Sequence, residues 1–76
     1  MKLSVLDTVV LNKDIPENGL KAGDVGVVVE IYEPEGIEVE FVTGSGETQA
    51  LVTLKKDDVH PISDREMLSV RTLDAA

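Results

Sequence analysis

Apolar side chains recur at every second position along much of this chain, and turn-forming residues separate the runs. A period of two predicts half-buried β-strands, whereas an amphipathic helix would show a period of about 3.6 residues. The five expected strands cover Val5–Leu11, Val25–Ile31, Ile37–Thr43, Gly46–Leu54 and Val59–Ile62. Between the last two strands, Lys55–Asp58 is expected to form a single turn of 3₁₀-helix.

The apolar positions predict the register of the first central hairpin. Alternate side chains of the second and third expected strands have to face one interior, because a slip of one residue would turn every buried side chain to solvent. The expected pairs are Val27 with Phe41, Val29 with Val39, and Ile31 with Ile37. The same register places Glu30 opposite Glu38 on the outer face. It places Glu40 one step further along, opposite Val28.

Turn chemistry adds a second constraint on the next hairpin. An inward Phe41 is expected opposite Thr48, and Val39 opposite Ala50. This pairing leaves Gly44–Ser45 as a two-residue loop. Glycine at the first position of such a loop is typical of a type II′ turn.

The order of the expected elements predicts an all-β fold, a small five-stranded SH3-like barrel over residues 1–62. The main alternative is an OB-fold, which normally carries a helix between its third and fourth strands; the Gly44–Ser45 turn leaves no room for one. The first loop, over 12–22, is long and polar. Its apolar residues Ile15 and Leu20 are expected to tuck back under the first strand.

The chain has 76 residues, which is enough for one domain only. After position 62 the pattern changes, and residues 63–76 are interpreted as a short C-terminal tail. Ser63–Glu66 has the spacing of a capping box and predicts a short helix, but Ser69–Thr72 equally suits an extended edge segment. Both alternatives stay open, and the last three residues are expected to fray.

The charge of the chain is strongly negative. Fifteen acidic and seven basic side chains give a formal net charge of −8, and the stretch between Lys21 and Lys55 contains acids but no base. Affinity for nucleic acid depends largely on lysine and arginine, which displace counterions from phosphates. The charge therefore disfavours nucleic acid and anionic membrane surfaces as partners.

Cysteine is absent and His60 is the one histidine, so neither a disulfide framework nor a zinc site is expected. The stretch from Leu3 to Leu11 is too polar for the core of a signal peptide, and no run of about 18 apolar residues predicts a membrane span. These features favour a cytoplasmic protein. No cofactor is expected.

Four aspartates and one histidine are the residues to weigh as catalytic groups, namely Asp7, Asp24, Asp57, Asp58 and His60. The pattern predicts a turn, cap or strand position for each, and no nucleophile and base stand in a triad-like spacing. The stretch Gly23–Gly26 lacks the following helix that a phosphate-binding loop requires. Its glycines are expected to serve a turn and close packing. The chain is therefore not expected to be an enzyme.

The acidic first central hairpin, formed by the second and third expected strands, is the strongest candidate for a binding surface. Like charges directly opposite each other on two strands destabilise the pair. One interpretation is a solvated face that resists aggregation; the other is a docking patch for a basic partner. The candidate partner-binding residues are Val28, Glu30, Tyr32, Glu38 and Glu40. Proline-rich peptides are disfavoured as ligands, because the aromatic rings that line such grooves are missing.

Several segments, in their order and spacing, resemble the small bacterial and cyanobacterial family called domain of unknown function 4926. The segments are 6–10, 14–17, 19–21, 23–32, 39–41 and 46–54, and the likeness extends over roughly residues 5 to 62. The resemblance implies a short stand-alone protein of SH3-like character. It assigns no activity and no functional residues.

The expected function is that of a non-enzymatic protein-interaction module. One version is an acidic antitoxin or immunity-type protein that covers a basic active site, because charge complementarity speeds association. The alternative is a small accessory subunit of an enzyme complex. The expected partner is another protein with a basic surface, and a homo-oligomer is left open.

Overall fold

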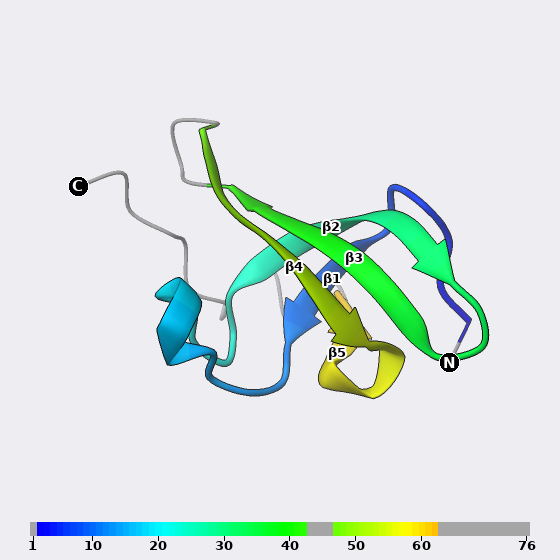
Figure 1. Cartoon of the computed structure of the whole chain (residues 1–76), viewed down its shortest axis with the longest axis horizontal. Helices are drawn as coiled ribbons and strands as arrows, with labels where there is room; N and C mark the ends of the chain where they lie inside the picture. Colours follow the sequence, from blue (N-terminus) through cyan, green and yellow to red (C-terminus); the bar gives the residue numbers. More distant parts are fainter. Residues whose placement is uncertain (1, 43–46, 63–76) are drawn as a thin grey trace.

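The computed structural model describes residues 2–42 and 47–62. Within these residues the chain forms five β-strands and two single turns of 3₁₀-helix (Figure 1). The elements are β1 (Thr8–Leu11), η1 (Pro16–Asn18), β2 (Val25–Tyr32), β3 (Gly36–Val42), β4 (Thr48–Lys55), η2 (Lys56–Asp58) and β5 (Val59–Pro61). The expected Gly44–Ser45 turn and the expected tail over 63–76 lie outside the described residues.

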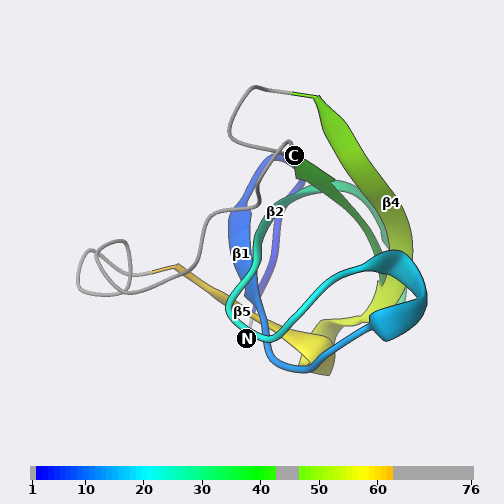
Figure 2. The ribbon, with the colours of Figure 1, turned by 90° about the vertical axis from the view of Figure 1, so that its left-hand side faces the viewer.

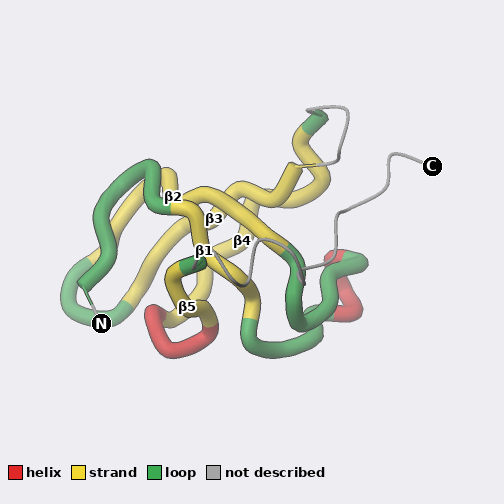
Figure 3. The backbone as a smooth tube through the Cα atoms, turned by 180° about the vertical axis from the view of Figure 1, so that it is seen from behind, coloured by secondary structure: helices red, strands yellow, loops and turns green. Residues whose placement is uncertain are grey.

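All five strands belong to one antiparallel sheet with the order β4-β3-β2-β1-β5. The sheet curls around its apolar face, so that β4 and β1 lie on opposite sides of the interior (Figure 2). From behind, strands make up most of the described chain (Figure 3). β4 and β5 are both edge strands, so the sheet is not closed. The predicted all-β class and the small SH3-like barrel are confirmed.

The core is almost entirely aliphatic, with one aromatic ring. It collects residues from every strand and from the long loop between β1 and β2. The largest fully buried apolar side chains are Phe41, Leu11, Leu20, Ile37, Val9, Val28, Val39 and Val59. In the long loop, Ile15 and Leu20 pair with each other across an isolated bridge, and both are buried. The prediction that these two residues tuck under the sheet is confirmed.

The predicted register of β2 with β3 is correct at one end and wrong at the other. Glu30 stands opposite Glu38, as expected, but a β-bulge follows, and Val28 rather than Val29 faces Val39. Val28 is fully buried, whereas Val29 is only partly buried. The expectations that Val28 lies on the outer face and that Val29 lies in the core are therefore wrong.

Gly26 explains why the bulge is needed. A Cβ atom at this position would lie 2.6 Å from Val39 Cγ1 and 2.9 Å from the Phe41 ring, so this residue has to face inward without a side chain. Gly26 and Val28 then share the inner face, and Ile31 also packs against the core. Positions 28 and 31 differ by an odd number, so one extra residue between them is required to keep both inside.

The predicted register of β3 with β4 is wrong by two residues. Phe41 lies opposite Ala50 instead of Thr48, and Val39 lies opposite Val52 instead of Ala50. A shift of two leaves the facing of every side chain unchanged, so hydrophobic pattern does not distinguish the registers. The observed register places larger aliphatic side chains opposite each other in the core.

The expected first strand begins three residues too early. A turn precedes β1, in which the Asp7 carboxylate accepts a hydrogen bond from the Ser4 amide at 2.8 Å and the Asp7 amide donates to the Ser4 carbonyl at 3.1 Å. Leu6 adopts a φ of 79° and is 74% exposed. Aspartate favours such turns because its side chain satisfies backbone donors locally.

Candidate functional site

The outer surface of β2, β3 and β4 forms a continuous face with acidic, hydroxyl and apolar side chains. We call this the acidic face and define it by Glu30, Tyr32, Glu38, Glu40, Leu51 and Thr53. In its centre, Glu30 of β2, Glu38 of β3 and Thr53 of β4 are consecutive cross-strand neighbours. Two carboxylates are therefore held next to each other on a rigid part of the sheet.

Two hydroxyl groups orient the Glu38 carboxylate. Thr53 Oγ1 donates a hydrogen bond to Glu38 Oε1 at 2.7 Å, and the Tyr32 hydroxyl donates a longer one to the same oxygen at 3.4 Å. Glu38 is thus held in one orientation at the centre of the acidic face, and no hydrogen bond from another described residue reaches its second carboxylate oxygen.

The pKa of Tyr32 is raised above its ordinary value. The largest cause is the partial burial of its phenol group, followed by the negative charge of Glu38, the hydrogen bond to Glu38 and the charge of Glu30. Each of these disfavours the phenolate. The two nearby carboxylates therefore add to the effect of burial on this phenol.

Two members of the acidic face were missed by sequence reasoning. Leu51 is 57% exposed and lies opposite Glu40 on the neighbouring strand, and Thr53 contacts Glu38. The alternation of β4 contains the signal that identifies them, because Val52 and Leu54 point inward and place positions 51 and 53 outside. Leu51 and Tyr32 supply the exposed apolar area that the sequence assigned to Val28, which is buried.

The ion pairs of the described residues lie away from the centre of the acidic face. Lys13 pairs with Asp58 at 3.6 Å, and Lys56 pairs with Glu33 at 2.7 Å. In the part of the chain that the structure describes, no lysine or arginine forms an ion pair with Glu30 or Glu38. Within residues 2–42 and 47–62, no neighbouring cation therefore compensates the negative charge of Glu30 and Glu38.

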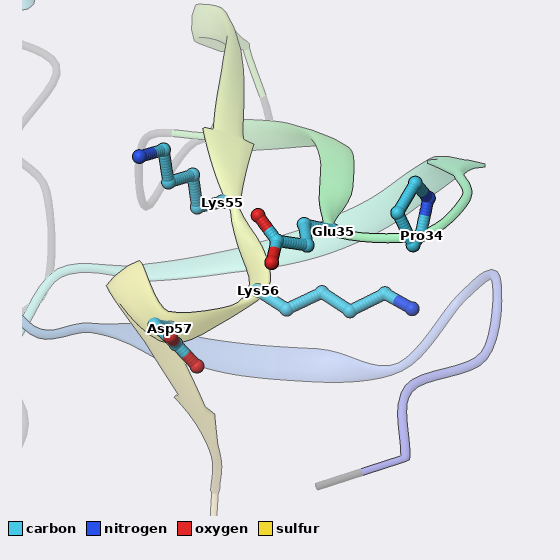
Figure 4. A pocket seen from close by; sticks show the side chains of 5 residues that line it. All are labelled: Pro34, Glu35, Lys55, Lys56 and Asp57. Atoms are coloured by element: carbon cyan, nitrogen blue, oxygen red, sulfur yellow. The ribbon is translucent and has the colours of Figure 1, made fainter.

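A pocket of about 220 Å³ lies beside the end of β4, where mixed charges meet (Figure 4). The Lys55 and Lys56 side chains point in opposite directions from the chain, and the Glu35 carboxylate lies between them. Lys56 donates its amide to the Glu35 carbonyl at 2.8 Å, and its ammonium pairs with Glu33. These contacts attach the loop between β2 and β3 to η2, which is a structural role.

Three of the four aspartates considered as catalytic groups serve as turn caps. Each accepts a hydrogen bond from the backbone amide three residues earlier in the chain. The bonds run from Ser4 to Asp7 at 2.8 Å, from Lys21 to Asp24 at 2.9 Å and from Lys55 to Asp58 at 3.0 Å. Asp57 is exposed in η2. The structure does not bring these carboxylates together into one site.

His60 lies on β5, half-buried, with Nδ1 in a hydrogen bond to Asn12 Oδ1. Asn12 also donates its side-chain amide to the Asp57 carbonyl at 3.2 Å, so it connects the first loop to η2. Within residues 2–42 and 47–62 there is no group of three or more potential ligand side chains placed to hold a metal ion. Nor does this part of the chain include a helix with the length and apolar character to span a membrane.

The model of the family described as domain of unknown function (DUF4926) matches residues 5–61, which is more than half of the chain. The chain belongs to this family. The DUF4926 match includes all five strands and every residue of the acidic face. Searches of curated proteins and of solved structures found no match. For this DUF4926 domain, the functional argument therefore has to come from the site itself.

Proposed function

We propose that this DUF4926 domain is a non-enzymatic protein-interaction module whose acidic face binds a basic surface of another protein. The observation that carries the proposal is the cross-strand pair of Glu30 and Glu38, which has no compensating cation among the described residues. Like charges in this arrangement destabilise the free sheet. A lysine or arginine from a partner would relieve that repulsion when it docks.

The composition of the acidic face suits such an interface. Glu38 is already oriented by Thr53 and Tyr32, so little side-chain entropy would be lost when it accepts a charged donor. Exposed Leu51 and Tyr32 add apolar and aromatic area beside the carboxylates, and tyrosine is enriched at protein interfaces. The net charge of −8 attracts a basic partner over a distance and repels phosphate backbones.

The form of this function that we favour is a neutralising protein of the bacterial cytoplasm, of the antitoxin or immunity type. A small acidic domain can cover a basic active site, and electrostatic steering makes its association fast. The alternative, an accessory subunit of an enzyme complex, would use the same face for a permanent contact. The two differ in how strongly binding depends on salt, because permanent interfaces are more apolar.

The test begins by capturing the partner from the native host at low salt and preparing it in pure form. Its affinity is then measured for the parent chain, for the Glu30→Gln/Glu38→Gln variant and for Asp57→Asn. The control removes one exposed acid in η2, away from the acidic face. We expect the double variant to bind about tenfold more weakly or worse at low salt, and the control to bind like the parent.

Equal affinity of all three proteins would contradict the proposal, because the acidic face would then not contribute to binding. Affinity that falls in the double variant but does not change between low and high salt would favour the accessory subunit over the neutralising protein.

A further inference from the structure

The free edge of β4 offers backbone hydrogen-bonding groups that no described residue uses. Lys56 donates its amide to the Glu35 carbonyl at 2.8 Å, so these two residues form a hydrogen-bonded pair in the ladder. Such pairs alternate with pairs that exchange no hydrogen bond. When this alternation is followed along the observed register, the β4 residues that are hydrogen-bonded to β3 are Leu54, Val52 and Ala50. Leu51, Thr53 and Lys55 therefore direct their amides and carbonyls away from the sheet.

One contact confirms this alternation of inward and outward backbone groups, and it marks the residue at which the free edge ends. The Lys55 amide donates to the Asp58 carboxylate at 3.0 Å, as an outward-pointing amide can. Among the described residues, no hydrogen bond satisfies the outward amides of Leu51 and Thr53. Between Ala50 and Leu54 the strand has no charged residue and no proline, two of the devices that protect an edge, and its register with β3 shifts only before Ala50.

A groove runs beside this edge. Its volume is about 190 Å³, and it is lined by Val52–Leu54 of β4 and by residues of the loop that carries η1. On the loop side, Asp14 and Glu17 line it; Lys13, its one basic lining residue on that side, pairs with Asp58. The unpaired charges that border the groove on this side are therefore negative.

We propose that the β4 edge binds an extended, basic segment of the partner protein, which adds to the sheet as a further antiparallel or parallel strand. This inference deepens the proposed function, because it rests on a basic protein partner and names how that partner is held. Strand addition gives affinity through main-chain hydrogen bonds. Because side chains of a strand alternate between its two faces, lysine or arginine on one face of the added strand would lie toward Asp14 and Glu17 in the groove. Basic residues on its other face would lie toward Glu38 and Glu40.

Charge complementarity selects this occupant over a second copy of the chain. Each copy has a net charge of −8, and a shared β4 edge would bring the acids around both grooves close together. Like charges across such a pair are destabilising. The acids beside the β4 edge would instead attract a basic strand. The charge therefore disfavours pairing of two copies and favours a cationic partner.

The probe for this inference is a short synthetic peptide of alternating lysine and valine, titrated into the full-length chain at low salt. Amide hydrogen exchange, followed by NMR, is the readout. We expect exchange of the Leu51 and Thr53 amides to slow by about tenfold or more when the peptide binds. The same peptide methylated on every backbone nitrogen, and a version with glutamate in place of lysine, should produce no such protection.

A matched pair of variants isolates the backbone donor. Leu51→Pro and Leu51→Val both remove the leucine side chain, but only proline also removes the outward amide, and the ladder with β3 does not use that amide. We expect Leu51→Pro to bind the peptide about tenfold more weakly than Leu51→Val. The methylated peptide needs no substitution in the chain, so the test holds even if Leu51→Pro does not fold.

Each contrary result identifies what has failed. Peptide binding with unchanged exchange at Leu51 and Thr53, and with shifts confined to Glu30 and Glu38, would overturn strand addition and leave the acidic face as the docking site. Protection that rises with protein concentration in the absence of peptide would make a second copy the occupant. Equal binding of the glutamate peptide, or no binding of the lysine peptide, would also overturn the inference.

Discussion

Gly26 and Phe41 lie next to each other in the core, and the phenyl ring occupies the space that a side chain at position 26 would need. A Cβ atom on Gly26 would lie 2.6 Å from Cγ1 of Val39 and 2.9 Å from two ring carbons of Phe41. Both neighbours are fully buried. Protein interiors are close-packed, so these side chains have little free volume into which they can move. The phenyl ring therefore packs directly over the glycine backbone.

Replacing Gly26 with alanine is expected to destabilise the protein, although alanine restricts the unfolded chain more than glycine does. Overpacking of a core typically costs about 1–3 kcal/mol in the free energy of unfolding, which exceeds that entropic gain. Denaturant unfolding measures the loss. In a Phe41→Leu background the same change should cost less, because the ring is gone. Equal stability of Gly26→Ala and the parent would contradict the observed packing.

Tyr32 reports on Glu38 without interference, because the chain has one tyrosine and no tryptophan. Glu38→Gln removes a negative charge and a charged acceptor, so we expect the pKa of Tyr32 to fall toward its ordinary value. Ultraviolet absorbance of the phenolate follows the titration. Glu40→Gln is the control, and it should leave the pKa close to that of the parent.

The raised pKa of Tyr32 also predicts how stability depends on pH. The folded state holds the phenol proton more tightly than the unfolded state, whose pKa is about 10. The resulting stabilisation is present below that pH and is lost as pH rises through the folded-state pKa. Thermal melts should show this alkaline loss more strongly for the parent than for Glu38→Gln. An unchanged tyrosine titration in Glu38→Gln would contradict the contact.

At the scale of elements, the sequence predicted the strands and their order along the chain better than their register. All five strands and the turn before β5 lie close to where alternation placed them. The bulge in β2 was not predicted, because an unbroken alternation of Val27, Val29 and Ile31 looks complete without Gly26. The pattern of apolar positions does not show that the Phe41 ring occupies the space beside position 26. That close contact is visible only in the folded core.

The errors in register also determine how much of the acidic face the sequence predicted. Glu30 and Glu38 were paired correctly because Ile31 and Ile37 fix the register on their side of the bulge. Val28 was misplaced because it lies beyond the bulge. Thr53 was missed because the register of β4 was inferred from a tight turn, and a shift of two residues changes neighbours without changing faces.

Neutralising Glu30 is expected to stabilise the free protein slightly. Glu30→Gln removes one of two opposed carboxylates, and cross-strand repulsion of this kind is worth about 0.2–1 kcal/mol. Thermal melts at low salt should show a small rise in midpoint, and the gain should shrink at high salt because exposed charges are screened. In the Glu38→Gln background the same change should have little effect. A loss of stability in Glu30→Gln would contradict the assigned repulsion.

At the scale of the whole molecule, negative charge is the property that connects fold and function. The described ion pairs attach loops to η2, whereas no described lysine or arginine forms an ion pair with Glu30 or Glu38 on the acidic face. A small domain has little stability to spare. An arrangement that weakens the free sheet while it concentrates potential on a rigid surface is expected where a binding partner supplies the missing cations.

The association rate with the captured partner, measured across ionic strength, tests this central claim most directly. We predict fast association of the parent at low salt with a steep fall as salt increases, and slower association with a flatter salt dependence for Glu30→Gln, which would combine higher stability with weaker binding. Identical rates and identical salt dependence for the parent and Glu30→Gln would contradict the claim that the acidic face docks the partner.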